Sequence, residues 1–498
     1  MVLGTTPSAD TAQRDSRWRS ADRRIVGGLG GLFPDPAEAA PRSWAMGAAG
    51  VAAQVAAVAL GALVLLLRIP GPHPWDALYL DDWGTFYVRQ LQHPWAVFAP
   101  QHGYAQVYPH LVAQFATYAP TAWVAKIFAI TGAATAAVCG LIVFHASSGL
   151  IRSRILRAAL ALAILLLPIA PLEIADNTVN SPWYMLLALF WACLWRPRTR
   201  TGMVAAALVG LITAASTSLV IVFAPLLAVR LYALRRPREH AVALGWLAGC
   251  LIQLPVIISS YGSGDDPLNG HKSLTGNTVA FYGHDVVLPA LGWHLSWWLQ
   301  TLAGRDGATA IVGVALLIVF LAILAAQPQS RLLVLTLLAF SFFVTVVSET
   351  LNPYPSTSPP VTQGLEGGAR YTALPIFLIQ AAVIVGVDRA LAYWGQRRSL
   401  AGQHPGEAVG RGTLVPRSVL TSPAGVLALL VLAVIVVSWI PDYRYLASNR
   451  FAYTTAPWST VVPKYQKACE SSPTGEILVR GMRAIPTPME IPCSGFHF

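Results

Sequence analysis

The chain has 498 residues, of which 55% are hydrophobic and only 11% carry a charged side chain. Soluble domains carry roughly 25% charged residues, so this composition excludes an ordinary soluble enzyme or binding protein. The net charge of +11 would suit a nucleic-acid-binding protein, but the basic residues lie in short segments between apolar stretches, where the positive-inside rule places them. We therefore expect an all-α polytopic membrane protein without a nucleic-acid partner.

The apolar stretches predict about eleven transmembrane helices, with the N-terminus in the cytoplasm and the C-terminus on the extracytoplasmic side. Residues 1–42 are polar and lack the apolar core of a signal peptide, which predicts a disordered cytoplasmic tail. Residues 43–440 are the predicted transmembrane region, and residues 441–498 a small extracytoplasmic tail. The stretch from Gly202 to Val229 is too long for one span, and the polar residues in its middle predict two short helices.

The first outer loop contains two adjacent carboxylates, Asp81 and Asp82, among aromatic and aliphatic neighbours. Such a mixture predicts a short amphipathic helix at the membrane interface. Partial desolvation there would make a carboxylate a better base, and the pair could also hold a divalent cation through its oxygens. The alternative is two solvated loop acids without a chemical role.

Two further outer segments carry polar side chains. His102 and His110 lie where the chain re-enters the membrane and are expected to line the same cavity as the acids. The alternative is that they are ordinary residues of the membrane interface without a role in binding. Glu173, Asn177 and Asn180 lie in a compact loop between two apolar spans. Acidic and amide side chains this close together are suited to hydrogen bonding with sugar hydroxyls. The alternative is that they only supply the polar residues that any turn between two spans needs.

Two residue pairs in the second half of the chain complete the candidate set. Arg370 and Tyr371 begin a late span on the outer face, where a guanidinium can bind a phosphate bidentately. The alternative for Arg370 is an ion pair with a nearby glutamate, or snorkelling. Cys469 and Cys493 lie in the outer tail, and an oxidising compartment predicts that they form a disulfide rather than two thiols.

The acid pair, the polar motifs of later outer loops and about a dozen spans together resemble the GT-C superfamily of integral-membrane glycosyltransferases. The residues that carry the resemblance are Asp81-Asp82-Trp83, the stretch Asn177–Trp183 and the segment Gly367–Tyr371. The resemblance implies a GT-C-like catalytic region with short outer amphipathic helices, in a bacterial cell membrane. It also implies a polyprenyl-phosphate-linked sugar as donor, a glycan or lipid acceptor, and membrane lipids as surroundings.

The resemblance further implies an inverting reaction at the outer face, in which Asp81 or Asp82 acts as general base. The residues expected to bind substrate are His102, His110, Glu173, Asn177, Asn180, Arg370 and Tyr371. The chain has no nucleotide-binding motif, as expected for a donor activated by its lipid phosphate. Two alternatives remain: a transporter or flippase of a lipid-linked or anionic solute, and a polymerase or ligase of surface polysaccharide. Span interiors almost free of charge favour the enzyme over the transporter.

Overall fold

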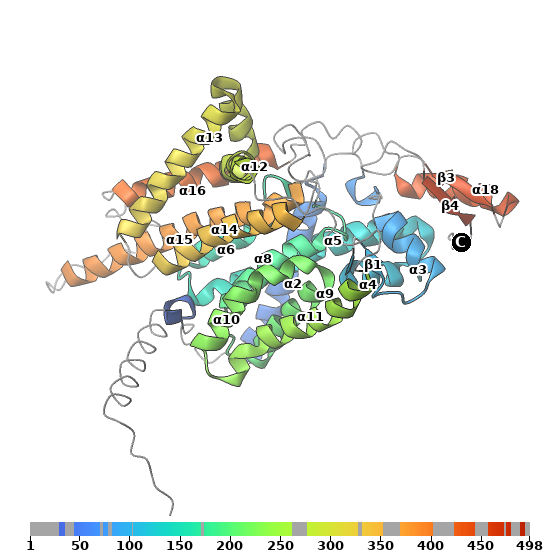
Figure 1. Ribbon diagram of the computed structural model, residues 1–498, viewed down its shortest axis with the longest axis horizontal. Helices are drawn as coiled ribbons and strands as arrows, with labels where there is room; N and C mark the ends of the chain where they lie inside the picture. Colours follow the sequence, from blue (N-terminus) through green and yellow to red (C-terminus); the bar gives the residue numbers. More distant parts are fainter. Residues whose placement is uncertain are drawn as a thin grey trace, which may run out of the picture.

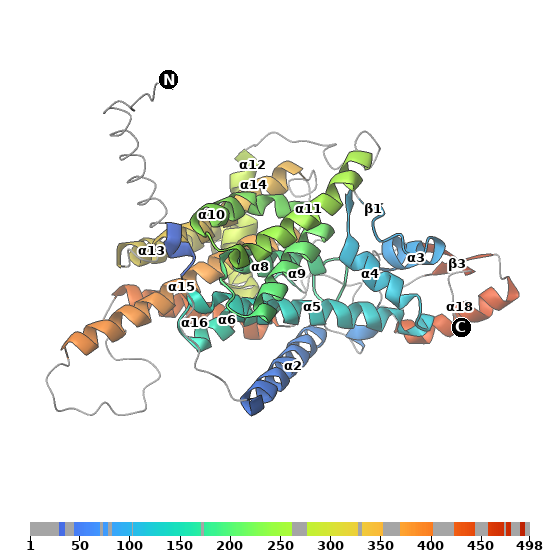
Figure 2. The same ribbon diagram turned by 90° about the horizontal axis from the view of Figure 1, so that it is seen from below.

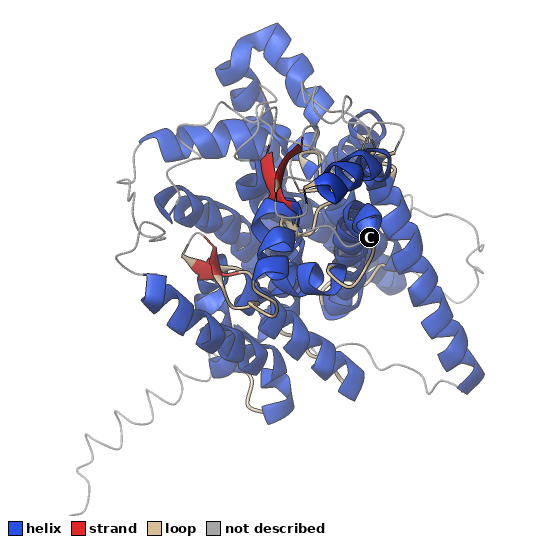
Figure 3. Ribbon diagram, turned by 90° about the vertical axis from the view of Figure 1, so that its right-hand side faces the viewer, coloured by secondary structure: helices blue, strands red, loops and turns tan. Residues whose placement is uncertain are grey.

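The structure is a computed structural model that describes residues 29–34, 44–69, 73–77, 82–101, 103–170, 174–260, 276–326, 331–351, 369–401, 423–443, 457–472, 475–479 and 489–493. Helices dominate these residues, and the strands described form only two small antiparallel pairs (Figure 3). Among the described residues, six helical stretches are long and apolar enough to cross a bilayer: 47–66, 121–149, 237–260, 293–325, 331–350 and 370–392. The protein is therefore an all-α, multi-pass membrane protein.

The helical bundle is built from apolar helices that run mainly along the long axis of the molecule (Figure 1). In chain order they are α2 (Trp44–Leu66), α5 (Val124–Ala146), α6 (Arg154–Leu165), α8 (Ser181–Leu194), α9 (Arg200–Ser216), α10 (Ala224–Ala233), α11 (Ala241–Ser260), α13 (Trp293–Ala326), α14 (Arg331–Leu351), α15 (Ala369–Ala401) and α16 (Pro423–Asp442). The pairs α9–α11, α14–α15 and α2–α5 pack closely, and Figure 2 shows α2 crossing α5 obliquely. The segment of α15 between Tyr371 and Ala390 is buried almost throughout, so α15 is a central helix of the bundle.

Short elements connect the long helices. They are η1 (Gly30–Leu32), η2 (Pro74–Asp76), the π-helix η3 (Asp82–Tyr87), α3 (Val88–Gln92), α4 (Val107–Ala116), η4 (Thr121–Trp123), η5 (Ser147–Gly149), η6 (Ser218–Phe223), η7 (Pro237–His240), α12 (Gly276–Phe281), the π-helix η8 (Tyr282–Val287), η9 (Leu288–Leu291) and α18 (Trp458–Ser471). The strands are β1 (Pro100–Gln101) paired with β2 (Tyr104–Ala105), and β3 (Glu476–Val479) paired with β4 (Met489–Pro492).

Several apolar helices are shorter than a bilayer is thick. The apolar helices of 10 to 17 residues are Ser181–Leu194, Arg200–Ser216, Ser218–Ala233 and Leu429–Asp442. The predicted total of about eleven spans stays a prediction, because length and composition identify six longer stretches within the part of the chain that the structure describes. The predicted division of residues 202–229 is confirmed: α9 ends at Ser216, Thr217 is extended, and a new helical segment begins at Ser218.

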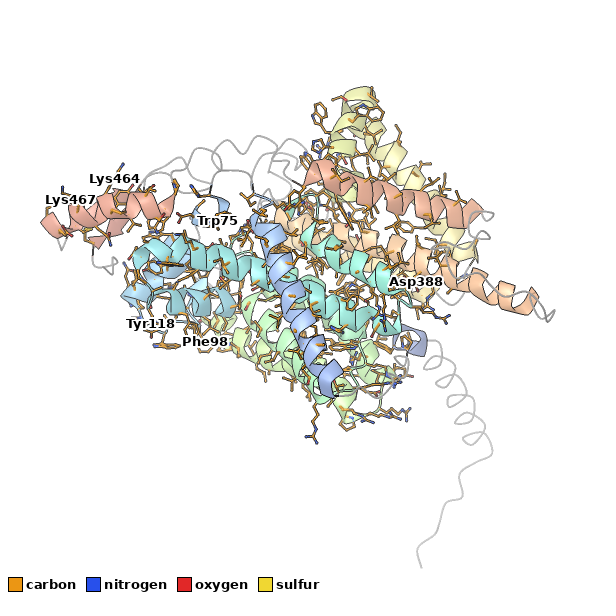
Figure 4. The ribbon with its side chains drawn as sticks, turned by 180° about the vertical axis from the view of Figure 1, so that it is seen from behind. Trp75, Phe98, Tyr118, Asp388, Lys464 and Lys467 are labelled. Carbon is orange, nitrogen blue, oxygen red and sulfur yellow. A yellow bond between two sulfur atoms is a disulfide. The ribbon has the colours of Figure 1, made fainter. Side chains whose placement is uncertain are left out.

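One end of the molecule carries a separate hydrophobic cluster. We call it the head, and it consists of the first loop (residues 73–77, 82–101 and 103–123) and the C-terminal unit (residues 457–472, 475–479 and 489–493). Its core residues include Trp83, Phe86, Tyr87, Val112, Trp458, Val462, Cys469 and Cys493, and Phe128 of α5 belongs to the same hydrophobic cluster. The head lies at the right in Figure 1, where α5 runs into it. Figure 4 shows Tyr118 and Lys464 at this end and Asp388 toward the other, which we call the opposite end.

The opposite end is held by buried polar contacts. The carboxylate of Asp388 accepts hydrogen bonds from the backbone N–H groups of Arg152, at 3.0 Å, and Ser153, at 2.8 Å, just before α6 begins. Residues 29–34, within the stretch predicted as a tail, also pack here. Phe33 is buried, its carbonyl accepts a hydrogen bond from Arg196 Nη1 at 3.1 Å, and the guanidinium of Arg230 lies over its ring.

Candidate functional site

The connection between α6 and α8 is recessed into the bundle. At 1.5 Å per residue, α6 is about 18 Å long and α8 about 21 Å, whereas the apolar core of a bilayer is about 30 Å thick. Both helices are too short to cross that thickness, and the described residues between them, 166–170 and 174–180, are mostly buried inside the bundle. The polar residues described in this loop, and the first residue of α8, are buried: Asp176, Asn177, Thr178, Asn180 and Ser181. Non-helical backbone at membrane depth is tolerated only where protein or a water-filled cavity surrounds it.

Contacts with α5 measure how deep this loop lies. Thr178 Oγ1 donates to the carbonyl of Phe128 at 2.9 Å and lies 2.9 Å from Thr131 Oγ1. A Cβ atom on Gly132 would come within 2.6 Å of the Asn177 carbonyl oxygen, so the missing side chain of Gly132 makes room for the loop. Gly132 is about 12 Å along α5 from Val124. The loop therefore reaches well below the head end of α5.

Asp82 joins the first loop to this recessed loop. Its Oδ1 accepts a hydrogen bond from the backbone N–H of Val179 at 2.9 Å, and its Oδ2 accepts one from Thr178 at 3.3 Å. The side chain is buried, with 1% of its surface exposed. An ionised carboxylate is only an acceptor, so these two N–H donors orient the Asp82 side chain.

The two asparagines shape the turn that presents those N–H groups. Asn177 Oδ1 accepts from the backbone N–H of Asn180 at 2.9 Å, and Asn177 Nδ2 donates to the carbonyl of Ala175 at 3.2 Å. Ser181, at the start of α8, donates its hydroxyl to the Asn177 carbonyl. Asp176 has a φ of 56°, a left-handed conformation that aspartate adopts more readily than most residues. The structure thus unites Asp82, Asn177 and Asn180 in one polar cluster.

Arg370 and Tyr371 lie against the same region through an aromatic contact. The ring of Tyr371 meets that of Trp183, in the first turn of α8, edge to face at 5.2 Å between centroids. The guanidinium of Arg370 lies 5.2 Å from the Tyr371 ring centroid, a cation–π geometry. Because Trp183 follows Asn180 by three residues, the start of α15 is beside the recessed loop. This completes a candidate site at the head end of the bundle.

His110 is in the core of the head and not in this cluster. Its ring is fully buried, its Nδ1 accepts from Gln90 Nε2 at 2.9 Å, and the ring of Phe86 lies edge-on at 4.8 Å. Burial lowers the pKa of His110 to about 4, and the nearby charge of Arg89 acts in the same direction. His110 is therefore a neutral packing residue that supports the π-helix beginning at Asp82.

A residue that the sequence prediction missed, Arg68, holds the recessed loop from the other side. Arg68 is fully buried at the head end of α2 and donates to the carbonyls of Leu165 at 2.8 Å, Leu167 at 2.6 Å and Tyr443 at 3.2 Å. Burial lowers its pKa to about 10, which the charges of Asp442 and Asp176 oppose. The available signal was a lone arginine at the end of a span predicted to face outward.

Three predicted site residues, Asp81, His102 and Glu173, lie outside the described residues. Among the residues described, no group of three or more histidine, cysteine or acidic side chains could hold a metal ion.

Cys469 and Cys493 form the disulfide that the sequence predicts, with an S–S distance of 2.05 Å. It closes the C-terminal unit, on the head. Comparisons with protein-family models, with curated proteins and with solved structures found no match for this chain.

Proposed function

We propose that this protein is an inverting membrane glycosyltransferase of the GT-C type. It moves a sugar from a polyprenyl-phosphate donor to a cell-envelope acceptor, a glycan or a lipid, at the head end of the bundle. The observation that carries this proposal is the buried Asp82 carboxylate, which the amides of the recessed polar loop hold at the head end of the bundle. Burying a carboxylate is costly even when it is hydrogen-bonded, and buried carboxylates in polar clusters are typical of catalytic sites.

The distribution of charge supports an extracytoplasmic head. Arginines gather at the opposite end, in the segments that connect helices there: Arg152, Arg154, Arg157, Arg196, Arg198, Arg200, Arg235, Arg236 and Arg238. Cytoplasmic loops carry such an excess of arginine and lysine. The disulfide of the C-terminal unit agrees, because disulfides persist in oxidising compartments. With this orientation, the head faces the compartment in which lipid-linked sugars are used without nucleotides.

The cluster offers separate groups for the two parts of a lipid-phosphate sugar. The guanidinium of Arg370 suits the phosphate, since planar donors match phosphate oxygens bidentately. The edge-to-face rings of Trp183 and Tyr371 provide an apolar surface beside it. The buried amides Asn177 and Asn180 shape the turn between these rings and Asp82. A donor whose lipid chain lies in the bilayer would bring its phosphate to this level.

The reaction step follows from these positions. A first-loop aspartate, Asp82 or its neighbour Asp81, takes the proton of an acceptor hydroxyl while that oxygen forms a bond to the anomeric carbon. The bond from that carbon to the phosphate oxygen breaks, and the electron pair leaves with the polyprenyl phosphate. One displacement inverts the configuration. Arg370 offsets the charge that develops on the departing phosphate, which is the usual role of a preorganised donor.

The test compares two buried aspartates that have the same kind of hydrogen-bond donors. Asp82→Asn and Asp388→Asn each replace a buried carboxylate that accepts two backbone N–H groups, but at opposite ends of the bundle. Each substitution places the NH₂ group of the new asparagine against a backbone N–H group, and this costs about 1–3 kcal/mol of stability. Transfer is measured with purified protein in nanodiscs and a panel of polyprenyl-phosphate sugars. Loss of a general base should lower transfer by about 10²–10⁴-fold.

We expect that loss for Asp82→Asn or for Asp81→Asn, whereas folded Asp388→Asn protein keeps its transfer rate. Full transfer by both Asp81→Asn and Asp82→Asn would refute the proposal. If the wild-type protein moves the lipid-linked sugar across a vesicle membrane without consuming it, the protein is a transporter instead.

A further inference from the structure

The C-terminal unit contacts the first loop on both sides of Asp82 along the chain. Trp458 and Ser459, at the start of α18, lie against Asp76 and Trp83, which precede and follow Asp82. More than 370 residues separate the partners in sequence, as the hydrogen bond between Ser459 and Asp76 spans 383 residues. Figure 1 shows the C-terminal elements and the first-loop helices together at the same end of the molecule.

The first contact is aromatic and involves the residue directly after Asp82. The ring of Trp83 lies 4.7 Å from that of Trp458 and 4.9 Å from that of Tyr87, and none of its surface is exposed. Trp458 is itself 4% exposed, and its Nε1 donates to the carbonyl of Thr121 at 2.8 Å. Since Thr121 begins the helical stretch that continues as α5, Trp458 links the π-helix of Asp82 to the helix on which the recessed loop packs.

The second contact is polar and lies ahead of Asp82. The buried carboxylate of Asp76 accepts hydrogen bonds from the backbone N–H of Ser459, at 3.4 Å, and from the hydroxyl of Ser459. A carboxylate at a helix N-terminus satisfies N–H groups that have no partner within the helix and is favoured by the helix dipole. Asp76 therefore fixes the start of α18, and with it the position of Trp458.

The disulfide holds the other end of α18. Cys469 and Cys493 are both buried in the hydrophobic cluster that contains Trp83 and Phe86. The bond ties α18 to β4, the strand that pairs with β3. The unit is therefore closed on itself and packed onto the first loop. Two exposed residues of the same helix, Lys464 and Lys467, point away from this contact (Figure 4).

We propose that the C-terminal unit is a positioning unit for Asp82, with Trp458 of the unit and Asp76 of the first loop as the positioning residues. Trp458 packs against Trp83 and so keeps the π-helix Asp82–Tyr87 at the depth where Asp82 meets the amides of Thr178 and Val179. The unit thereby completes a site built by elements from three distant parts of the chain. This proposal rests on the proposed function as regards catalysis, but the positioning itself can be measured without any activity.

The test uses Trp458→Ala, with Lys464→Ala as a control on an exposed position of the same helix. Hydrogen–deuterium exchange is measured on the peptide that covers residues 82–92. A large aromatic truncation removes buried contacts that keep this segment closed, so exchange should rise by about tenfold or more in Trp458→Ala. Lys464→Ala should exchange like the wild type. Unchanged exchange of residues 82–92 in folded Trp458→Ala overturns the proposal.

Two further measurements separate positioning from general destabilisation. Trp458→Phe keeps an aromatic ring against Trp83 and should restore most of the protection that Trp458→Ala loses. Transfer should fall by at least about tenfold in Trp458→Ala and recover in Trp458→Phe, since a misplaced catalytic group costs rate without unfolding the protein. If wild-type protein is active and Trp458→Ala transfers at the same rate despite raised exchange, Trp458 is not a positioning residue.

Should Trp458→Ala not fold, folded wild-type protein can be treated with a membrane-impermeant phosphine that reduces the disulfide. Reduction frees α18 from β4, so exchange should rise first in residues 458–472 and then in residues 82–92. A rise in the C-terminal peptide with no change in residues 82–92 overturns the coupling. If no donor is consumed by the wild type, the glycosyltransferase proposal fails, whereas the exchange data still decide whether the unit holds Asp82.

Discussion

Gly132 lies where α5 packs against the backbone of the recessed loop, and Gly132→Ala perturbs that contact with a single methyl group. The added Cβ would meet the backbone of Asn177, with the carbonyl oxygen at 2.6 Å, the carbonyl carbon at 2.8 Å and the nitrogen at 3.0 Å. These are backbone atoms and cannot rotate away. The loop itself must therefore move, and it carries both amide groups that hold Asp82.

The size of the effect follows from these distances. A carbon and a carbonyl oxygen rest at about 3.3 Å or more, so the loop must withdraw by about 0.7 Å. Such overpacking costs about 1–3 kcal/mol of stability. The hydrogen bond from Thr178 to Asp82 is already 3.3 Å long, so this displacement breaks it. A misplacement of about 1 Å can cost about 10²-fold in rate, so we expect a tenfold to hundredfold loss of transfer.

The matched control is Gly140→Ala on the same helix. Its Cβ would lie 3.3 Å from the Ala161 carbonyl oxygen, a tight contact that a shift of a few tenths of an ångström relieves. Both substitutions gain the same helix propensity, about 1 kcal/mol for alanine over glycine, so their difference isolates the contact with the loop. The assays are thermal unfolding in detergent and transfer from a polyprenyl-phosphate sugar. If the two variants unfold at the same temperature and transfer equally well, the recessed packing of this loop is wrong.

Three further perturbations test other parts of the bundle. Arg68→Met leaves three carbonyls without their charged donor and should lower the free energy of unfolding by about 3–5 kcal/mol in a thermal-unfolding assay. Arg154→Met replaces an exposed side chain and should lower it by less than about 0.5 kcal/mol. Equal losses of stability in the two variants would contradict the role of Arg68. Burial depresses the pKa of His110 from 6.5 to about 4, so between these pH values the unfolded chain takes up a proton that the folded chain does not. The free energy of unfolding should therefore fall by about 3 kcal/mol as the pH drops from about 6.5 to 4. His110→Gln should make the free energy of unfolding less dependent on pH in that range, and an unchanged pH dependence would refute this. Gly292→Ala puts a side chain at a φ of 129° and also against the side chain of Ser438, whereas Gly304→Ala puts one at a φ of 69° with no atom within 4 Å of it. Gly292→Ala should therefore lower the temperature midpoint of unfolding more than Gly304→Ala does. The reverse order would contradict the close contact between Gly292 and Ser438.

Membrane class followed from composition because a chain with few charges and apolar stretches of spanning length has few stable alternatives. The break between α9 and α10 was readable for a related reason: the polar residues around Thr217 interrupt an apolar stretch. The number of spans was harder to predict. Helices such as α6 and α8 are apolar but short, and a sequence pattern does not show that the chain turns back inside the bundle.

Some residues of the candidate site could likewise be predicted from the sequence, and the surroundings of others could not. Polar residues in loops between apolar spans singled out Asp82, Asn177 and Asn180, because such side chains have no place against lipid. His110 satisfied the same pattern, yet its ring is enclosed by Gln90 and Phe86, which no spacing rule reveals.

Local chemistry of the chain is enough to indicate a membrane bundle, its polar loops and a pair of cysteines fit to bond. Three contacts are not evident from it. Asp82 accepts hydrogen bonds from backbone N–H groups 96 and 97 residues away, Arg68 donates to a carbonyl at the end of α6, and Trp458 packs beside Trp83. Those contacts depend on how helices of unequal length stack in three dimensions. Their register is set by close packing at positions such as Gly132, where a single absent methyl group determines how closely a distant loop can approach.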